Sequence, residues 1–163
     1  MQTLFDHPHD VLRFCRDTPD ATLVIVTSVE GGAMRSAGAL MAVSSGAVAG
    51  YVSNGCVDAD IVTRARQGVA GTFIYGEGSP FRDIILPCGG RIEVAIIPSP
   101  DQHVIGKLVS DLDARRSSNF CISPDFQLTT KSDSDTLFET ALTPKLRLRI
   151  AGRGEALVAL SRL

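Results

Sequence analysis

A nine-residue run of mostly β-branched side chains restricts the fold of this chain more than any other stretch. Residues 22–30, TLVIVTSVE, do not alternate between apolar and polar side chains. A strand with one face in water would alternate, so this run predicts a strand that is covered on both faces. Residues 91–98, RIEVAIIP, predict a second strand, which Pro98 terminates.

Apolar side chains recur at helical spacing in three further segments. These are residues 9–17, residues 57–71 with Asp58 and Asp60 in the first turn, and a segment from Pro100 to Arg116. Short strands are predicted at residues 39–44, 47–53 and 72–75, and a hairpin around Ser123–Pro124. The sequence therefore predicts an α/β fold in which helices flank a mixed β-sheet.

The last segment has a pattern of its own. Residues 145–163, KLRLRIAGRGEALVALSRL, predict a strand, a G-R-G-E-A-L turn and the start of a helix. This order opens a dinucleotide-binding βα unit, but the sequence ends before the other strands and helices of such a domain. We therefore expect a domain over residues 1–140 and the truncated start of an incomplete Rossmann-like domain over residues 141–163. The chain would then be a fragment or a truncated form of a longer protein.

Charge and cysteine spacing exclude several classes of protein. The 163 residues carry a net charge of −2, which predicts neither a nucleic-acid partner nor an anionic membrane. The first residues do not form a signal peptide, and no run approaches the roughly 20 apolar residues of a membrane helix, so we expect a cytoplasmic protein. The four cysteines form no C-x-x-C pair, which argues against a zinc knuckle, and a cytoplasmic location argues against disulfides.

Three glycine-bearing loops carry the candidate functional residues: GGAMRSAG (31–38), SNGC (53–56) and PCGG (87–90). In SNGC, Gly55 permits a tight turn that would set Cys56 at or near a helix N-terminus. The unpaired N–H groups there stabilise a thiolate and attract anions, and a thiolate is a soft metal ligand. The alternative is that Cys56 is a small packed residue.

The other candidates also have a structural alternative. Cys88 is followed by Gly89 and Gly90, which let the backbone approach a ligand, but a tight turn with a buried thiol needs the same residues. Arg35 offers a bidentate contact to a phosphate or carboxylate, or is a solvated loop residue. Cys15 and Cys121 lie in apolar patterns and are expected to be structural.

The order of these motifs resembles that of the xanthine dehydrogenase accessory family, also named for carbon monoxide dehydrogenase maturation (XdhC/CoxI). The matching stretches are Gly32 to Gly38 with Arg35, Ser53 to Asp58, Cys88 to Val94, and Glu139 and Pro144 before Ile150 to Gly154. The chain departs from the family pattern at Met34, where a proline is common, at Asn54 in place of a glycine, and at Asp58 in place of a glutamate. The larger departure is that most of the family's C-terminal Rossmann domain is absent.

The resemblance implies a chaperone-like maturation protein more than an enzyme, and no catalytic residue is assigned. Family members bind the molybdenum cofactor (molybdopterin), support its sulfuration, and hand it to a molybdenum hydroxylase of the xanthine dehydrogenase or CO dehydrogenase type. The implied partners are the hydroxylase apoenzyme and a sulfur-donating cysteine desulfurase. The residues carried over as cofactor-binding are Arg35, Gly55, Cys56, Cys88, Gly89 and Gly90, with Cys56 and Cys88 as metal ligands.

Two alternative functions stay open at this point. One is an NAD(P)-dependent oxidoreductase fragment, for which GRGEAL would be the cofactor turn. The other is a non-catalytic, oligomeric interaction module that pairs through its C-terminal segment, whose apolar surface would need a cover.

Overall fold

A five-stranded sheet forms the centre of the protein. The computed structural model describes residues 7–80, 86, 89–147, 149 and 151–160. The strands of this sheet follow the order β3-β2-β1-β5-β4, and each neighbouring pair is antiparallel. They are β1 (Thr22–Glu30), β2 (Leu40–Val43), β3 (Val48–Gly50), β4 (Gly71–Gly76) and β5 (Arg91–Ile97).

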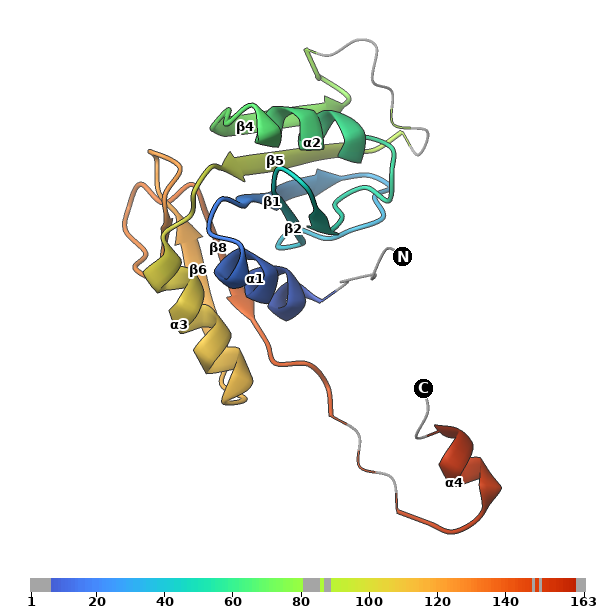
Figure 1. Ribbon diagram of the computed structural model, residues 1–163. Helices are drawn as coiled ribbons and strands as arrows, with labels where there is room; N and C mark the ends of the chain where they lie inside the picture. The colour runs from blue at the N-terminus through green and yellow to red at the C-terminus, as the bar shows by residue number, and fades with distance from the viewer. Residues whose placement is uncertain (1–6, 81–85, 87–88, 148, 150, 161–163) are drawn as a thin grey trace.

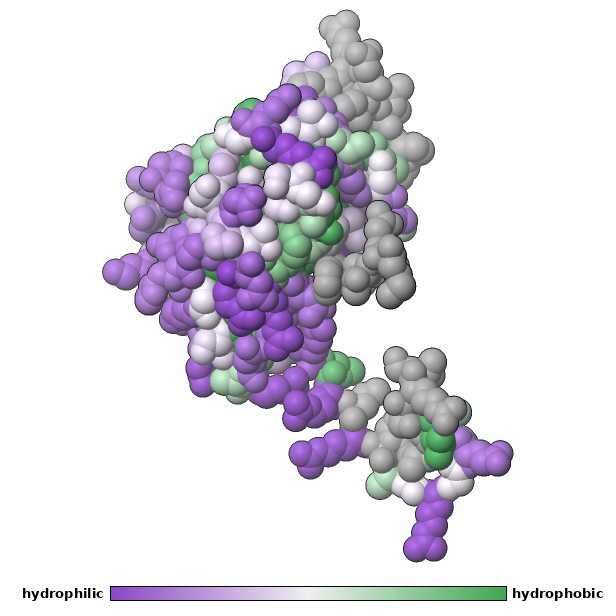
Figure 2. Space-filling view, in the orientation of Figure 1, coloured by the Kyte–Doolittle hydropathy of each residue, from purple (hydrophilic) through white to green (hydrophobic). Residues whose placement is uncertain are grey.

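Helices cover both faces of this sheet, as Figure 1 shows. Helix α2 (Asp58–Arg66) lies on one face, whereas α1 (Pro8–Asp17) and α3 (Gln102–Asp113) pack together on the side of the other. A second, three-stranded antiparallel sheet packs against α3, with the order β7-β6-β8. Its strands are β6 (Ser118–Ile122), β7 (Leu128–Thr129) and β8 (Phe138–Leu142). In Figure 2 the outer surfaces of α1 and α3 are mostly hydrophilic, as expected for helices that bury their apolar sides.

Strand β1 separates two hydrophobic cores. Leu23 and Ile25 point into the core shared with α1 and α3, while Val24 and Val26 point into the core beneath α2. All four side chains are fully buried. Because successive side chains of a strand alternate between faces, this burial requires cover on both sides. The prediction of a strand covered on both faces is therefore confirmed.

The α/β class and the flanking helices are confirmed as well, while the strand pairing differs in detail from the mixed sheet expected. The described ladders are all antiparallel. The reason is that α2 joins β3 to β4, which lie at opposite edges of the sheet, so it does not link two adjacent parallel strands. Cys15 and Cys121 are buried, as expected, and burial raises the pKa of the Cys15 thiol to about 12.

The C-terminal segment differs from the expectation. Residues 143–147 form no strand in the described part of the chain, and the short helix α4 (Glu155–Leu160) follows farther along. A strand needs a neighbour for its backbone groups, and this segment runs away from both sheets in Figure 1. None of the helices among the described residues is long and apolar enough to span a membrane.

Candidate functional site

The glycine loop 31–38 meets the described residues Gly89 and Gly90 at one end of the five-stranded sheet. Glu30, the last residue of β1, stands opposite Arg91, the first residue of β5. Arg91 also stands opposite Gly76, the last residue of β4. The loop that follows β1 and the loop that joins β4 to β5 therefore leave the sheet side by side. Figure 1 shows that α2 begins at this same end.

A hydrogen bond ties the first turn of α2 to this end of the sheet. The Tyr75 hydroxyl donates to the Asp60 carboxylate at 2.6 Å, and the tyrosine side chain is fully buried. Arg64, one turn later, pairs with the same carboxylate at 2.6 Å and lies over the ring of Phe73. Burial, reinforced by the hydrogen bond to Asp60, raises the pKa of Tyr75. Tyr75 of β4 thus holds the first turn of α2 against this end of the sheet.

The SNGC loop is held by the side chain of the first helical residue. Asp58 Oδ1 accepts the N–H groups of Val52 at 3.1 Å and Ser53 at 3.0 Å, and Oδ2 accepts that of Gly55 at 2.6 Å. The sequence places Asp58 in the first turn of a helix, which is confirmed, but it does not reveal that the carboxylate turns back onto the loop. Cys56 is exposed on this loop.

The location of Cys56 excludes one of the two interpretations of that residue, the small packed residue. Helix α2 begins two residues after Cys56, with Val57 at the N-cap position, as the sequence predicts. Because the side chain is exposed, Cys56 is not a packed core residue. The turn before it uses two residues with positive φ, Asn54 at 58° and Gly55 at 106°, the second of which favours glycine.

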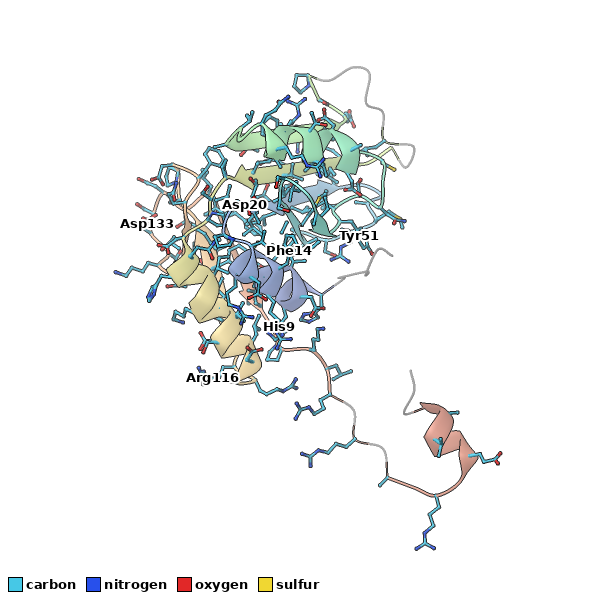
Figure 3. The ribbon with its side chains drawn as sticks, in the orientation of Figure 1. His9, Phe14, Asp20, Tyr51, Arg116 and Asp133 are labelled. Carbon is cyan, nitrogen blue, oxygen red and sulfur yellow. The ribbon has the colours of Figure 1, made fainter. Side chains whose placement is uncertain are left out.

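Arg35 lies against an aromatic ring rather than in open solvent. Its guanidinium carbon is 4.7 Å from the centroid of Tyr51, and the side chain is half-buried. Tyr51 follows β3 and precedes the SNGC loop; in Figure 3 it lies on the side of the molecule where α2 begins. Tyr51 was not predicted as a site residue, because an aromatic residue beside a short strand gives no signal of its own.

A shallow groove of about 360 Å³ opens beside Arg35. It runs between the arginine loop, the start of α1 and the end of β8, so segments far apart in the sequence line it. Its polar side chains come from His7, Arg35, Ser36, Thr140 and Thr143, and the thioether of the exposed Met34 is also at its wall. A cation and several hydroxyls facing one groove suit an anionic group.

Close backbone packing joins the first and third glycine loops. Gly32 and Gly89 form a parallel bridge. A Cβ built on the buried Gly90 would lie 2.1 Å from the carbonyl oxygen of Gly32, and one on Gly76 would lie 2.0 Å from the carbonyl oxygen of Gly90. These contacts leave no room for side chains, so packing alone accounts for glycine at position 90.

Gly89 is exposed, and a Cβ built there meets no atom of the described residues within 4 Å, so the loop surface next to it is open. Cys88 lies outside the described residues, and its meeting with Cys56 stays a prediction. Within the described ranges, His, Cys, Asp and Glu side chains form no group of three or more that would hold a metal ion.

Arg91 is a further charged residue at this end of the sheet, and sequence reasoning missed it. Its guanidinium pairs with Glu30 at 2.7 Å and with Glu93 at 3.5 Å. The half-buried Glu93 thereby gains the partner that a carboxylate within a strand requires. Arg91 thus links the end of β1 to the start of β5, next to the glycine loops.

Known proteins match this chain in sequence and in structure. The sequence model of the XdhC and CoxI family matches residues 16–75, which contain the Arg35 loop and the SNGC loop. The molybdenum cofactor insertion chaperone PaoD of Escherichia coli (strain K12) is 32% identical over 166 residues, which cover 92% of this chain and 52% of that protein.

A solved structure has a fold similar to that of this chain. A crystal structure described as a xanthine dehydrogenase from Bacillus halodurans superposes with a TM-score of 0.67 at 18% identity, over 85% of this chain and 53% of that one. The chain thus spans about half the length of these relatives. Together with the order of the glycine loops, the matches show that the chain belongs to the XdhC and CoxI family.

Proposed function

We propose that this protein binds the molybdenum cofactor as cargo and delivers it to the apoenzyme of a molybdenum hydroxylase. The observation that carries this proposal is the 32% identity, across 92% of the chain, to a protein named as a molybdenum cofactor insertion chaperone. The proposal includes the finer steps: support of cofactor sulfuration, with a cysteine desulfurase as the sulfur donor, and a xanthine dehydrogenase or CO dehydrogenase type of recipient.

Cys56 is the residue that we assign to the metal. Its side chain is exposed at the end of the sheet where the glycine loops meet, on a loop whose backbone is fixed by three hydrogen bonds to Asp58. A thiolate is a soft ligand, and a ligand on a rigid loop loses little conformational entropy when it binds. Cys88 as second ligand, with Gly89 beside it, belongs to the same proposal.

Arg35 is the residue that we assign to the phosphate of the pterin. The ring of Tyr51 orients its guanidinium, and the groove next to it contributes the hydroxyls of Ser36, Thr140 and Thr143. Guanidinium and hydroxyl groups are common phosphate ligands. Gly90 would stand behind this site as scaffold, since its backbone packs against the start of the arginine loop.

Anaerobic loading tests the proposal directly. The protein is mixed with molybdenum cofactor released from a molybdoenzyme, desalted, and analysed for molybdenum by mass spectrometry and for pterin by fluorescence. We expect Cys56→Ser to lose most of the molybdenum. Arg35→Ala should weaken pterin binding roughly tenfold or more, the size of a lost hydrogen bond to a charged group.

The matched control is Arg16→Ala. Arg16 is an exposed arginine that pairs with Asp17 at the end of α1, before the opposite end of β1. The Arg16→Ala variant should retain as much molybdenum and pterin as the wild type. Wild-type protein that retains neither molybdenum nor pterin would refute the proposed function, and a Cys56→Ser variant with normal molybdenum would remove Cys56 from the site.

A further inference from the structure

The side chain of Asp58 closes a clamp around the residues that precede it in the sequence. Its two oxygens accept three backbone N–H groups, from Val52, Ser53 and Gly55. A fourth bond, from the N–H of Val57 to Ser53 Oγ at 2.9 Å, closes the same loop from the other side. We infer that Asp58 is a positioning residue: it holds the loop in the one conformation that presents Cys56 to the metal of the cofactor. This inference rests on the proposed function of Cys56.

Core packing holds the two ends of this turn, at Ser53 and Val57, but not its exposed tip. Asn54, Gly55 and Cys56 are all exposed. A Cβ built on Gly55 meets nothing within 4 Å among the described residues, and the backbone there has a φ of 106°. An exposed glycine without neighbours samples many conformations, and the 2.6 Å bond from its N–H to Asp58 is what selects one of them.

The geometry requires both oxygens of a carboxylate. Both oxygens of Asp58 act as acceptors, and one of them accepts twice. An asparagine has one acceptor oxygen and turns an NH₂ group toward either Gly55 or the pair before it, where an N–H donor already points.

A general helix-capping role is separable from this positioning role within the same turn. Asp58 and Asp60 are both acidic residues of the first turn of α2, where either one stabilises the helix dipole. Asp60 is bonded to Arg64 and Tyr75, whereas Asp58 is bonded to the loop. If Asp58 acted only on the helix, its replacement would have the same effect on Cys56 as the replacement of Asp60.

The clamp also reaches toward the other half of the proposed site. Val52, whose N–H is bound by Asp58, is the direct neighbour of Tyr51, the ring on which Arg35 lies. A single short segment therefore supports both the residue assigned to the metal and the residue that orients the phosphate ligand. We expect the loss of the clamp to affect Cys56 most and Arg35 to a smaller extent.

The test compares Asp58→Asn with Asp60→Asn in the full chain. Hydrogen exchange at the Gly55 amide and the rate of iodoacetamide alkylation, followed on the Cys56 peptide by mass spectrometry, report the loop without any cofactor. We expect Asp58→Asn to speed Gly55 exchange about tenfold or more and to change the alkylation rate, while Asp60→Asn leaves both near the wild-type values. Affinity for the released cofactor should fall 10- to 100-fold in Asp58→Asn, a typical effect for partners of metal ligands.

The outcomes separate this inference from the proposed function. Equal Gly55 exchange and equal alkylation in the two variants would overturn the inference whether or not the protein binds cofactor. Wild-type cofactor affinity in Asp58→Asn, with the loop opened, would overturn it as well. Wild-type protein that binds no cofactor refutes the proposed function and with it the ligand role of the clamp. If Asp58→Asn does not fold, Asp58→Ser beside Asp60→Ser supplies the same comparison, because one hydroxyl oxygen replaces the two carboxylate oxygens that accept the three N–H groups.

Discussion

Replacement of Gly90 by alanine should separate the arginine loop from the sheet end and destabilise the protein. The new Cβ would lie 2.1 Å from the carbonyl oxygen of Gly32, and real Cβ contacts essentially never fall below 3.0 Å. The two backbone segments must therefore separate by about 0.9 Å, against atoms that have no flexible side chain to yield. Overpacking of this kind costs typically 1–3 kcal/mol, and the rigidity of both partners places Gly90→Ala at about 3 kcal/mol or more.

The matched control is Gly46→Ala. Gly46 lies in the turn between β2 and β3, its φ is not positive, and a Cβ there meets nothing within 4 Å among the described residues. Alanine at such a position restricts the unfolded chain and stabilises by about 0.4–1 kcal/mol.

Urea unfolding, followed by circular dichroism, measures the free energy of unfolding of both variants, and thermal unfolding measures their Tm. A loss of about 3 kcal/mol corresponds to a fall in Tm of roughly 6–12 °C for a chain of this size. A free energy of unfolding for Gly90→Ala within about 0.5 kcal/mol of that for Gly46→Ala would refute this prediction. The steric contact would then be relieved at no cost in stability.

Three other variants test separate parts of the structure. Tyr75→Phe removes a hydrogen bond to the carboxylate of Asp60 and should cost about 1.5–3 kcal/mol at neutral pH in urea unfolding. Because the folded pKa of Tyr75 is raised above its ordinary value of 10.0, that stability is fully present below pH 10 and declines as the pH rises further. The difference in free energy of unfolding between wild type and Tyr75→Phe should therefore decrease above pH 10. An increase there would contradict the assigned hydrogen bond from Tyr75 to Asp60. Tyr51→Leu removes the ring beneath Arg35 and should cost about 0.5–1 kcal/mol in pterin affinity, measured by fluorescence titration, while Tyr51→Phe retains most of it. Leu12→Ala opens a cavity in the core shared by α1 and α3 and should lower the free energy of unfolding by about 2–5 kcal/mol; a loss below 1 kcal/mol would mean that this core relaxes around the missing atoms.

The elements predicted from the sequence are those whose signal is local. The run at residues 22–30 and the segment at residues 91–98 form β1 and β5 with bounds close to those predicted, because buried strands carry long apolar runs. Strand β8, with the sequence FETAL, was missed, since its alternation is short and Leu142 is the one apolar side chain of the strand that is buried. Its position depends on pairing with β6, which no local pattern reveals.

The same limit applies to the site. The Arg35 loop and Cys56 stand out in the sequence because a glycine turn beside a reactive side chain is a local pattern. The contact between Tyr51 and Arg35 is not local in the sequence, because Tyr51 follows β3 whereas Arg35 lies in the loop before β2. The Asp58 clamp is local in sequence, yet it depends on a side-chain rotamer and on two positive φ values that sequence patterns do not fix.

The glycines of the three loops look alike in the sequence and have two different physical roles. Gly90 is buried against the carbonyl group of Gly32, so a side chain there is excluded by the protein itself. Gly55 and Gly89 are exposed, and a Cβ built on either one meets no atom of the described residues within 4 Å. Only the second kind leaves backbone that a ligand can reach. Under the proposed function, we expect the cofactor to touch the loops at Gly55 and Gly89, while Gly90 holds the loops together beneath it.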